Sequence, residues 1–468
     1  MSLSSVVEKR EAKVKEFGIG DKIGYGLGDL GCGAFFQFIS SYLMLFYTDI
    51  LGISATSVAT LFVVARVWDA IMDIIMGVIL DKATPTKYGK FRPYVLWCGV
   101  PMIISGVICF MYIPSISEGM KLPFAYVTYI IFGMLYTAVN IPYGSLASVM
   151  TTKSDERTSL STFRNIGTIL SSLVVMVLVP KLIFQNEVAT AVGFLRCSLV
   201  FAVISIVSFI LTFKLTRERI TNRTVKKEDG NNMKEVIKNL IKNRAFVGVT
   251  LMSLTMMSST FLYNTLNAYL YKEYFHRVDL IAVAGVAGII AMFAVIPFVG
   301  KLAGKFGKKE ITIAGLLLSM IVYGGLFFIN IKNPYLYIVL YMIANLGTGM
   351  VNAVIWALVG DAIDYQEYIS GERNEGVLYS SYSLFRKLSQ AISGGIGGFA
   401  LAALGYKSGV EVQIESVGAG VKNIVCGGYV IGLGISLLIM IFVYNLSKSK
   451  LSEVSEELNK RRNLVNEA

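Results

Sequence analysis

Long apolar runs, each about the length of a membrane-spanning helix, alternate with short polar segments along the whole chain. A spanning helix needs about 20 mostly apolar residues, and blocks of this kind recur at regular spacing. The expected spans are 24–47, 56–80, 94–114, 123–146, 161–184, 193–213, 245–269, 280–300, 311–330, 335–358, 377–404 and 423–445. The pattern predicts an all-α integral membrane protein with twelve transmembrane helices.

One long polar stretch, residues 214–244, divides these spans six and six. The two sets echo each other, because a glycine, a tight basic loop and Gly-Lys follow the second span at 76–93 and the eighth at 298–310. Two related six-helix halves are typical of the major facilitator fold, in which substrate binds between the halves near the membrane midplane. The expected divisions are an N-terminal half (1–213), a cytoplasmic linker (214–244), a C-terminal half (245–446) and a cytoplasmic tail (447–468) that forms a surface helix.

Lysine and arginine are spread unevenly over the polar segments. The even-numbered loops, which share a side with both ends of the chain, hold 21 of them. The opposite loops hold Lys121, Lys272, Arg277, Lys332 and Lys407. The positive-inside rule therefore predicts a multi-pass protein of the cell membrane with both termini in the cytoplasm. This bias and attraction to anionic lipid account for the net charge of +12 without a nucleic-acid partner.

Composition excludes several other classes of protein. Charged residues make up 16% of the chain against 54% hydrophobic, and mean hydropathy is +0.63, whereas ordinary soluble domains are about 25% charged. The five cysteines stand singly in apolar segments, and the one histidine, His276, lies in a predicted loop. No phosphate-binding loop and no nucleophile–base pair is visible. We expect neither an enzyme nor a cofactor-dependent protein.

The second span carries charges in the stretch RVWDAIMDIIMG, residues 66–77. Asp69 and Asp73 are one helical turn apart and share a face. A charge at the bilayer centre costs about 2.5–3.5 kcal/mol on insertion scales. Carboxylates within a span are therefore expected to be paired or to serve a function. Either Arg66 neutralises Asp69 in a structural ion pair, or the two acids hold a proton or a monovalent cation in a transport path.

Further polar and aromatic side chains occur within other spans. Hydroxyls, amides, guanidinium, ammonium and aromatic rings together suit a polyhydroxylated ligand. Each of them, taken singly, also fits a packing or interface role, and Asp29 fits a helix-packing contact equally well. The candidate residues are Asp29 in span 1, Tyr136, Thr137 and Asn140 in span 4, Arg164 in span 5, Asn352 and Trp356 in span 10, and Ser383 and Lys387 in span 11.

Seven stretches together resemble the glycoside–pentoside–hexuronide:cation symporter family, which contains the melibiose, glucuronide and xyloside permeases. They are YGLGD (25–29), FYTDILG (46–52), RVWDAIMDIIMG (66–77), YGKFRPY (88–94), NIPYGSL (140–146), GDAIDYQEYISGERNEG (360–376) and YSSYSLFRKLSQ (379–390). The resemblance extends from residue 25 to about 406. It implies the major facilitator fold and uptake of a sugar or glycoside with H⁺, Na⁺ or Li⁺.

The resemblance also implies roles for individual residues. Asp69 and Asp73 match the paired cation carboxylates of helix 2, Arg164 matches the sugar-engaging arginine of helix 5, and Lys387 matches the helix 11 lysine. A cytoplasmic cluster that closes the inner gate by ion pairs matches Asp361, Asp364 and Arg373.

The melibiose permease pattern differs from this chain at two positions that bear on the coupling ion. Its helix 4 acid is Asn140 here, and its asparagine between the two helix 2 acids is Met72. Sodium prefers a cage of several hard oxygen ligands. With Asp69, Asp73, Thr137 and Asn140 as the coupling residues, we expect H⁺ in preference to Na⁺, while a sodium site at the two aspartates stays open.

Two other functions remain as alternatives from the sequence. One is a major facilitator transporter of a non-sugar ligand such as a lysophospholipid, and the other is a sugar sensor that does not translocate. The polar faces of the spans disfavour the first, because a lysophospholipid needs a wide apolar cavity. The short cytoplasmic loops disfavour the second. Expected partners are therefore the substrate and the lipid bilayer, with protein partners unknown.

Overall fold

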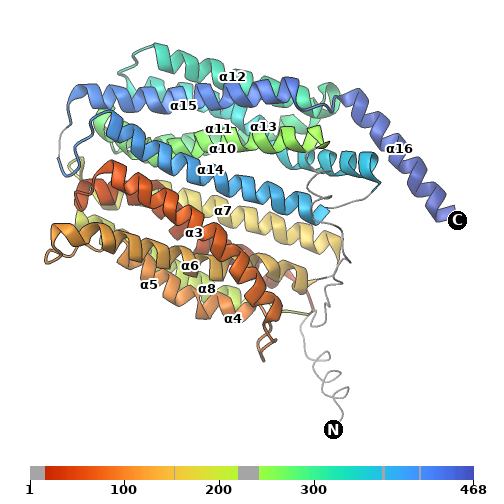
Figure 1. Cartoon of the computed structure of the whole chain (residues 1–468), viewed down its shortest axis with the longest axis horizontal. Helices are drawn as coiled ribbons and strands as arrows, with labels where there is room; N and C mark the ends of the chain where they lie inside the picture. The colour runs from red at the N-terminus through yellow and green to blue at the C-terminus, as the bar shows by residue number, and fades with distance from the viewer. Residues whose placement is uncertain (1–15, 152, 220–241, 372–374, 411–412, 468) are drawn as a thin grey trace, which may run out of the picture. The chain divides into compact units, whose positions relative to one another are not determined.

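The computed structural model describes residues 16–151, 153–219, 242–371, 375–410 and 413–467, and almost all of them are helical. The chain forms two compact units. Unit 1 comprises residues 1–225 with 407–411, and unit 2 comprises 226–406 with 412–468. Their boundary falls inside the expected linker, of which residues 220–241 lie outside the described part. Each unit is considered by itself, and Figure 1 labels the helices of both.

Unit 1 contains six long apolar segments in the order expected from the sequence. Its elements are α2 (Ile19–Leu45), η1 (Phe46–Ile50, a π-helix), α3 (Ala55–Lys82), α4 (Arg92–Trp97), α5 (Gly99–Ile108), α6 (Glu118–Met150), α7 (Ser154–Ile183), β1 (Phe184–Gln185), β2 (Val188–Ala189) and α8 (Ala191–Leu215). The strands β1 and β2 pair antiparallel in a small hairpin that an all-helical pattern does not predict.

Unit 2 repeats this layout and adds a helical tail. Its elements are α10 (Arg244–Tyr269), η2 (Leu270–Tyr274, a π-helix), α11 (Leu280–Phe306), α12 (Lys308–Phe328), α13 (Pro334–Ser370), α14 (Glu375–Ala403), α15 (Glu415–Phe442) and α16 (Lys448–Glu467). The tail helix was expected from its apolar spacing, and its Val454 and Leu458 side chains are buried.

Helices occupy all twelve ranges in which the hydropathy pattern predicted a span. Among the described residues, nine helical segments are long and apolar enough to cross a membrane, and Arg92–Ile108 and Leu388–Ala403 are shorter apolar helices. The remaining predicted span is α3, which carries the charges at 66–73. The all-α membrane architecture is thus confirmed, while the count of twelve crossings stays a prediction.

The first helix of each unit ends in the same local geometry. Backbone amides donate from Leu51 to Phe46 at 3.1 Å in unit 1 and from Phe275 to Leu270 at 3.3 Å in unit 2. Amides two residues further on, at 53 and 277, each reach back six residues at 2.9 Å. A five-residue π-helix is rare, so its recurrence at corresponding positions shows that the two units are built on one plan.

Glycines bring helices α2 and α7 of unit 1 into backbone contact. A methyl group on Gly26 would meet the carbonyl of Phe163, and one on Gly167 would meet the carbonyl of Gly26. Small residues allow such close approach between helices in a membrane, where it replaces the missing hydrophobic driving force. The contact places Asp29 of α2, one turn beyond Gly26, beside the middle of α7.

Candidate functional site

The Asp29 carboxylate joins α2 to α7 through two side chains. Arg164 donates its Nε to Asp29 Oδ1 at 3.2 Å, and the Thr168 hydroxyl donates to Asp29 Oδ2. Arg164 and Thr168 are one turn apart on α7, so they present two donors on one face. The Arg164 guanidinium also lies over the Tyr143 ring, 5.3 Å from its centroid. Two of the predicted site residues, Asp29 and Arg164, therefore form an ion pair.

A second ion pair lies within α3 and contacts α6. Arg66 Nη1 is 3.1 Å from Asp69 Oδ2, and its Nη2 donates to the Tyr129 hydroxyl at 3.1 Å. A side chain at Gly133 would strike Asp69 Oδ1, so α6 offers a glycine where the carboxylate packs. The contact places Arg66 where it can neutralise Asp69, which is one of the two alternatives that the sequence left open.

Asp73 lies one turn further along α3 and engages a different group on α6. Thr137 donates its hydroxyl to Asp73 Oδ1 at 3.3 Å. Asn140 follows Thr137 on α6, and the structure shows no hydrogen bond from its side chain to another described residue. Arg66 thus contacts Asp69, and Thr137 contacts Asp73.

Aromatic rings lie beside the Arg66–Asp69 pair. Phe36 of α2 stacks on Tyr136 of α6 with ring centroids 5.1 Å apart, and the Arg66 guanidinium lies 5.7 Å from the Phe36 centroid. We name the polar centre of unit 1 by the residues that α2, α3, α6 and α7 bring to this region. They are Asp29, Arg66, Asp69, Asp73, Tyr136, Thr137, Asn140 and Arg164.

The candidates from the second half lie in unit 2. Asn352 donates to the Thr348 carbonyl of its own helix α13 at 3.0 Å. Trp356, one turn further, packs edge-on against Tyr382 of α14 with centroids 5.4 Å apart and remains 52% exposed. Ser383 and Lys387 lie on α14, but their side chains are outside the described part of the chain.

The predicted gate cluster has a partner that the sequence did not indicate. Lys308, at the start of α12, places its Nζ 2.7 and 2.8 Å from the two carboxylate oxygens of Asp361. Asp364 lies on the same helix α13 three residues later, while Arg373 falls outside the described residues. The ion pair of Asp361 that is observed therefore joins two helices of unit 2.

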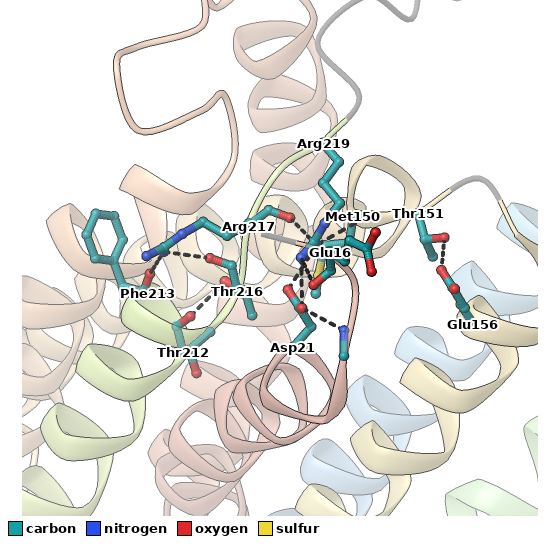
Figure 2. A network of polar contacts seen from close by, with 11 residues as sticks. Glu16, Asp21, Met150, Thr151, Glu156, Thr212, Phe213, Thr216, Arg217 and Arg219 are labelled. Atoms are coloured by element: carbon teal, nitrogen blue, oxygen red, sulfur yellow. Dashed lines mark hydrogen bonds and ion pairs between the residues drawn. The ribbon is translucent and has the colours of Figure 1, made fainter. Parts of the chain in front are cut away.

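A comparable network ties together helix ends of unit 1 (Figure 2). Arg219 donates to both oxygens of Asp21, at 3.0 and 2.9 Å, and also to the carbonyls of Met150 and Glu16. It thus links the start of α2 to the end of α6. Close by in Figure 2, Thr151 donates to Glu156 and holds the pKa of that carboxyl below its ordinary value.

The neighbouring residue Glu218 extends this network to the start of α4. Its carboxylate accepts the backbone amides of Lys90, Phe91 and Arg92, all at 2.8 Å. The segment that follows α8 therefore holds the ends of three other helices of unit 1. One of these ends, the start of α4, lies in the basic YGKFRPY stretch (88–94), so this motif has a structural role in unit 1.

Sequence reasoning missed several members of these clusters. Thr168, Tyr129, Gly133 and Lys308 were not singled out, although three of them carried a helical-spacing signal. Thr168 follows Arg164 by four residues, and positions 129, 133 and 137 form one stripe on α6. No spacing within the chain could have found Lys308, because it lies 53 residues from Asp361.

Comparison with known proteins adds independent evidence. A family model described as MFS/sugar transport protein matches residues 24–448. The isoprimeverose transporter of Lactiplantibacillus pentosus is 32% identical over 437 residues, covering 92% of this chain and 89% of that protein. A glucuronide carrier protein homolog of Escherichia coli (strain K12) is 31% identical over 444 residues, covering 94% and 95%.

A solved structure supports the fold on separate grounds. The crystal structure of a D-xylose-proton symporter superimposes with a TM-score of 0.67 at 14% identity, covering 92% of this chain and 98% of that one. At this low identity the likeness concerns the arrangement of helices and not the substrate.

Proposed function

Because the chain belongs to the MFS/sugar transport protein family, and within it to the glycoside–pentoside–hexuronide:cation symporters, we propose that it imports a sugar or glycoside together with a monovalent cation by alternating access. The coupling ion of this proposal is H⁺ rather than Na⁺. The protein works in the cell membrane with both termini in the cytoplasm, as the distribution of lysine and arginine favours.

The observation that carries the proposal is the unequal pairing of two neighbouring carboxylates on α3. Asp69 is held by Arg66 at 3.1 Å, whereas Asp73 accepts a hydroxyl from Thr137 at 3.3 Å. Charges within a span are costly and mark ion or substrate paths. Because Arg66 is in position to neutralise Asp69, our proposal assigns the gain and loss of the coupling cation to Asp73.

The donor set around Asp73 favours a proton. Sodium needs several oxygen ligands, as hard cations do, and Arg66 competes for Asp69 Oδ2. One carboxylate beside a hydroxyl, by contrast, is sufficient to bind and release a proton.

The sugar would be recognised by the remaining groups of the polar centre. Arg164 and Asn140 offer N–H donors, Tyr136 offers an aromatic ring and hydroxyl, and all three lie in unit 1. Sugar hydroxyls are met by such paired donors and acceptors, and the apolar ring face by an aromatic side chain. Asn352, Trp356, Ser383 and Lys387 of unit 2 remain predicted substrate-binding residues.

Purified protein in proteoliposomes tests the proposal in two steps. Counter-transport of a labelled panel of pentosides, hexosides and hexuronides first identifies a substrate. Uptake of that substrate is then measured under an imposed proton gradient at equal sodium, and under a sodium gradient at equal pH. Accumulation under the proton gradient alone is expected.

Two results would contradict different parts of the proposal. If no sugar exchanges, the proposed substrate class is wrong. If sodium alone drives accumulation of an exchanging sugar, the coupling assignment is wrong and further oxygen ligands must complete a sodium cage around Asp69 and Asp73.

A further inference from the structure

Helices α2 and α7 carry two stripes of residues at four-residue spacing that meet in register. The stripes are Asp29, Gly33 and Gln37 on α2, and Arg164, Thr168 and Ser172 on α7. Asp29 contacts Arg164 and Thr168 at one place along the stripes. Two turns further along α2, Gln37 donates its Nε2 to the Ser172 hydroxyl oxygen at 2.7 Å. The two helices therefore share a second polar contact beyond the ion pair.

This second contact lies on the same face of α2 as the ion pair. The Arg164 side chain is 37% exposed, and Thr168 is also exposed. Charged groups within a span face the protein interior or a water-filled path and not the lipid. Gln37 shares that face and is itself partly exposed. A ligand bound at Arg164 thus comes within reach of Gln37 if it is long enough.

The amide of Gln37 is held in one orientation and keeps an acceptor to spare. The Ser172 hydroxyl donates to the Thr168 carbonyl at 3.0 Å, so its oxygen accepts from Gln37 Nε2. Among the described residues, no donor reaches Gln37 Oε1. A primary amide offers a carbonyl acceptor beside N–H donors, which matches two neighbouring hydroxyls of a sugar ring.

The distance between the two polar contacts exceeds the size of one sugar ring. Eight residues separate Asp29 from Gln37, which corresponds to about 12 Å along the axis of α2. Between them the stripe has only Gly33, where an added methyl group would lie 2.8 Å from the Ser171 hydroxyl oxygen. No α2 side chain of this stripe therefore stands between the two contacts, and the spacing suits two linked rings.

Gln37 and Ser172 both lie outside the seven stretches that carry the family resemblance. Those stretches include Asp29, so the ion pair belongs to machinery shared by permeases with different substrates. A choice among such substrates has to come from residues outside the shared set. Gln37 is such a residue on the polar face that α2 and α7 form.

We infer that Gln37 is a specificity-determining residue that binds the second ring of a two-ring glycoside, so that this transporter selects glycosides with two linked sugar rings over one-ring sugars. Ser172 is a positioning residue, because it acts through the amide of Gln37. The inference rests on the proposed function, since it names the substrate class within the sugars and glycosides proposed above.

The experiment uses the full-length protein in proteoliposomes and three matched pairs of sugars. The pairs are methyl β-xyloside with xylobiose, methyl β-glucoside with cellobiose, and methyl β-galactoside with lactose. Within a pair the first ring and its β-linkage are the same, and only the second compound has a second ring. Each compound is scored by inhibition of counter-transport of a labelled sugar that exchanges. In the pair that competes best, the two-ring compound is expected to bind at least about tenfold more tightly, as one or two added hydrogen bonds allow.

The decisive variant is Gln37→Leu, which keeps the size of the side chain and removes its amide. It should weaken binding of the two-ring compound about tenfold and that of the methyl glycoside less than about twofold. Ser172→Ala frees the amide to rotate and should weaken only the two-ring compound, by about threefold. The matched control is Gln185→Leu, the same change at an exposed residue of the hairpin, which should alter neither.

The outcomes separate the inference from the proposed function. Equal binding within every pair, or no competition by any of the six compounds while another sugar exchanges, overturns the inference and leaves sugar transport intact. Equal weakening of both members of a pair by Gln37→Leu also overturns it, because the residue then has only a structural role. If Gln37→Leu does not reach the membrane, an unchanged preference in Ser172→Ala overturns it. A wild-type protein that exchanges no sugar refutes the proposed function and the inference with it.

Discussion

Unit 1 and unit 2 share one helical plan but differ in what they place within their helices. In unit 1 the charged side chains of α2, α3 and α7 include two ion pairs well inside the helices, Arg66–Asp69 and Arg164–Asp29. In unit 2 the charged side chains that the structure describes lie toward helix ends, as Lys308 and Asp361 do. Arg386 and Lys387 of α14 are charged by sequence, but their side chains lie outside the described part.

Stacked tyrosine pairs occupy the interior of unit 2. Tyr323 stacks on Tyr429 with centroids 4.0 Å apart, and Tyr263 stacks on Tyr341 at 5.0 Å. A tyrosine buries a large apolar ring with one hydroxyl, which costs far less in a membrane than an ionised group. In the proposed transport cycle we therefore expect the charge-dependent steps to involve the ion pairs of unit 1.

The largest effect is expected from Asp73→Asn in unit 1. The amide cannot exchange a proton, so the variant should exchange sugar but accumulate none above the outside concentration. The matched control is Asp279→Asn, the same chemical change at an exposed residue next to α11 in unit 2, which should accumulate normally. Labelled sugar uptake with and without an imposed proton gradient measures both variants. Accumulation by Asp73→Asn above the outside concentration would show that Asp73 is not needed for coupling.

The second prediction concerns the space that α6 leaves for Asp69. Gly133→Ala places a methyl group against Asp69 Oδ1, whereas Gly325→Ala in unit 2 meets no atom within 4 Å. Overpacking a buried contact typically costs about 1–3 kcal/mol. We expect Gly133→Ala to lower the melting temperature and weaken proton-driven uptake, and Gly325→Ala to do neither. Equal melting temperatures for the two variants would contradict the packing described for α3 and α6.

A third prediction compares the ion pairs at the helix ends of the two units. Arg219 binds Asp21 with two parallel hydrogen bonds, while Lys308 reaches both oxygens of Asp361 from one nitrogen. A lysine cannot reproduce a two-pronged contact. Arg219→Lys should therefore lower the melting temperature by a few degrees, and Lys308→Arg by less. The reverse order would mean that the network in Figure 2 does not hold the end of unit 1 together.

The smallest effects are expected from two buried hydroxyls. Tyr143 donates to the Tyr25 carbonyl in unit 1, whereas the Tyr271 hydroxyl in unit 2 has no hydrogen-bond partner among the described residues. Removing a hydrogen bond costs about 1 kcal/mol, while removing an unsatisfied buried hydroxyl is nearly neutral or stabilising. In thermal unfolding, the melting temperature of Tyr143→Phe should fall, and that of Tyr271→Phe should stay unchanged or rise slightly. A greater loss in Tyr271→Phe would show that its hydroxyl has a partner after all.

The candidate site was predictable wherever residues lie on one helix. The pair Arg66–Asp69 and the shared face of Asp69 and Asp73 follow from helical spacing, and the first of these is observed as an ion pair. Contacts between helices were not predictable in the same way. Asp29 and Arg164 were both singled out by sequence, but nothing in their positions, 135 residues apart, indicated that they pair.

The expected gate gives a second example of a contact between helices that the sequence did not indicate. Its residues Asp361, Asp364 and Arg373 are neighbours in sequence, and the structure shows in addition that Asp361 contacts Lys308 at the start of α12. The lysine approaches because α12 and α13 pack closely, with Gly315 and Gly347 each facing the backbone of the other. A partner that arrives by helix packing cannot be read from local spacing.

By itself the sequence determined the membrane class and the helix positions, because hydropathy and helical period are properties of each segment alone. Its division into two six-helix halves stays a prediction. It also determined which charged groups lie within spans. The tertiary structure decided which of them pair, since glycine contacts such as Gly26–Gly167 set how near two distant helices approach. That approach distance makes Asp29 the counter-charge of Arg164 and leaves Asp73 with a neutral hydroxyl.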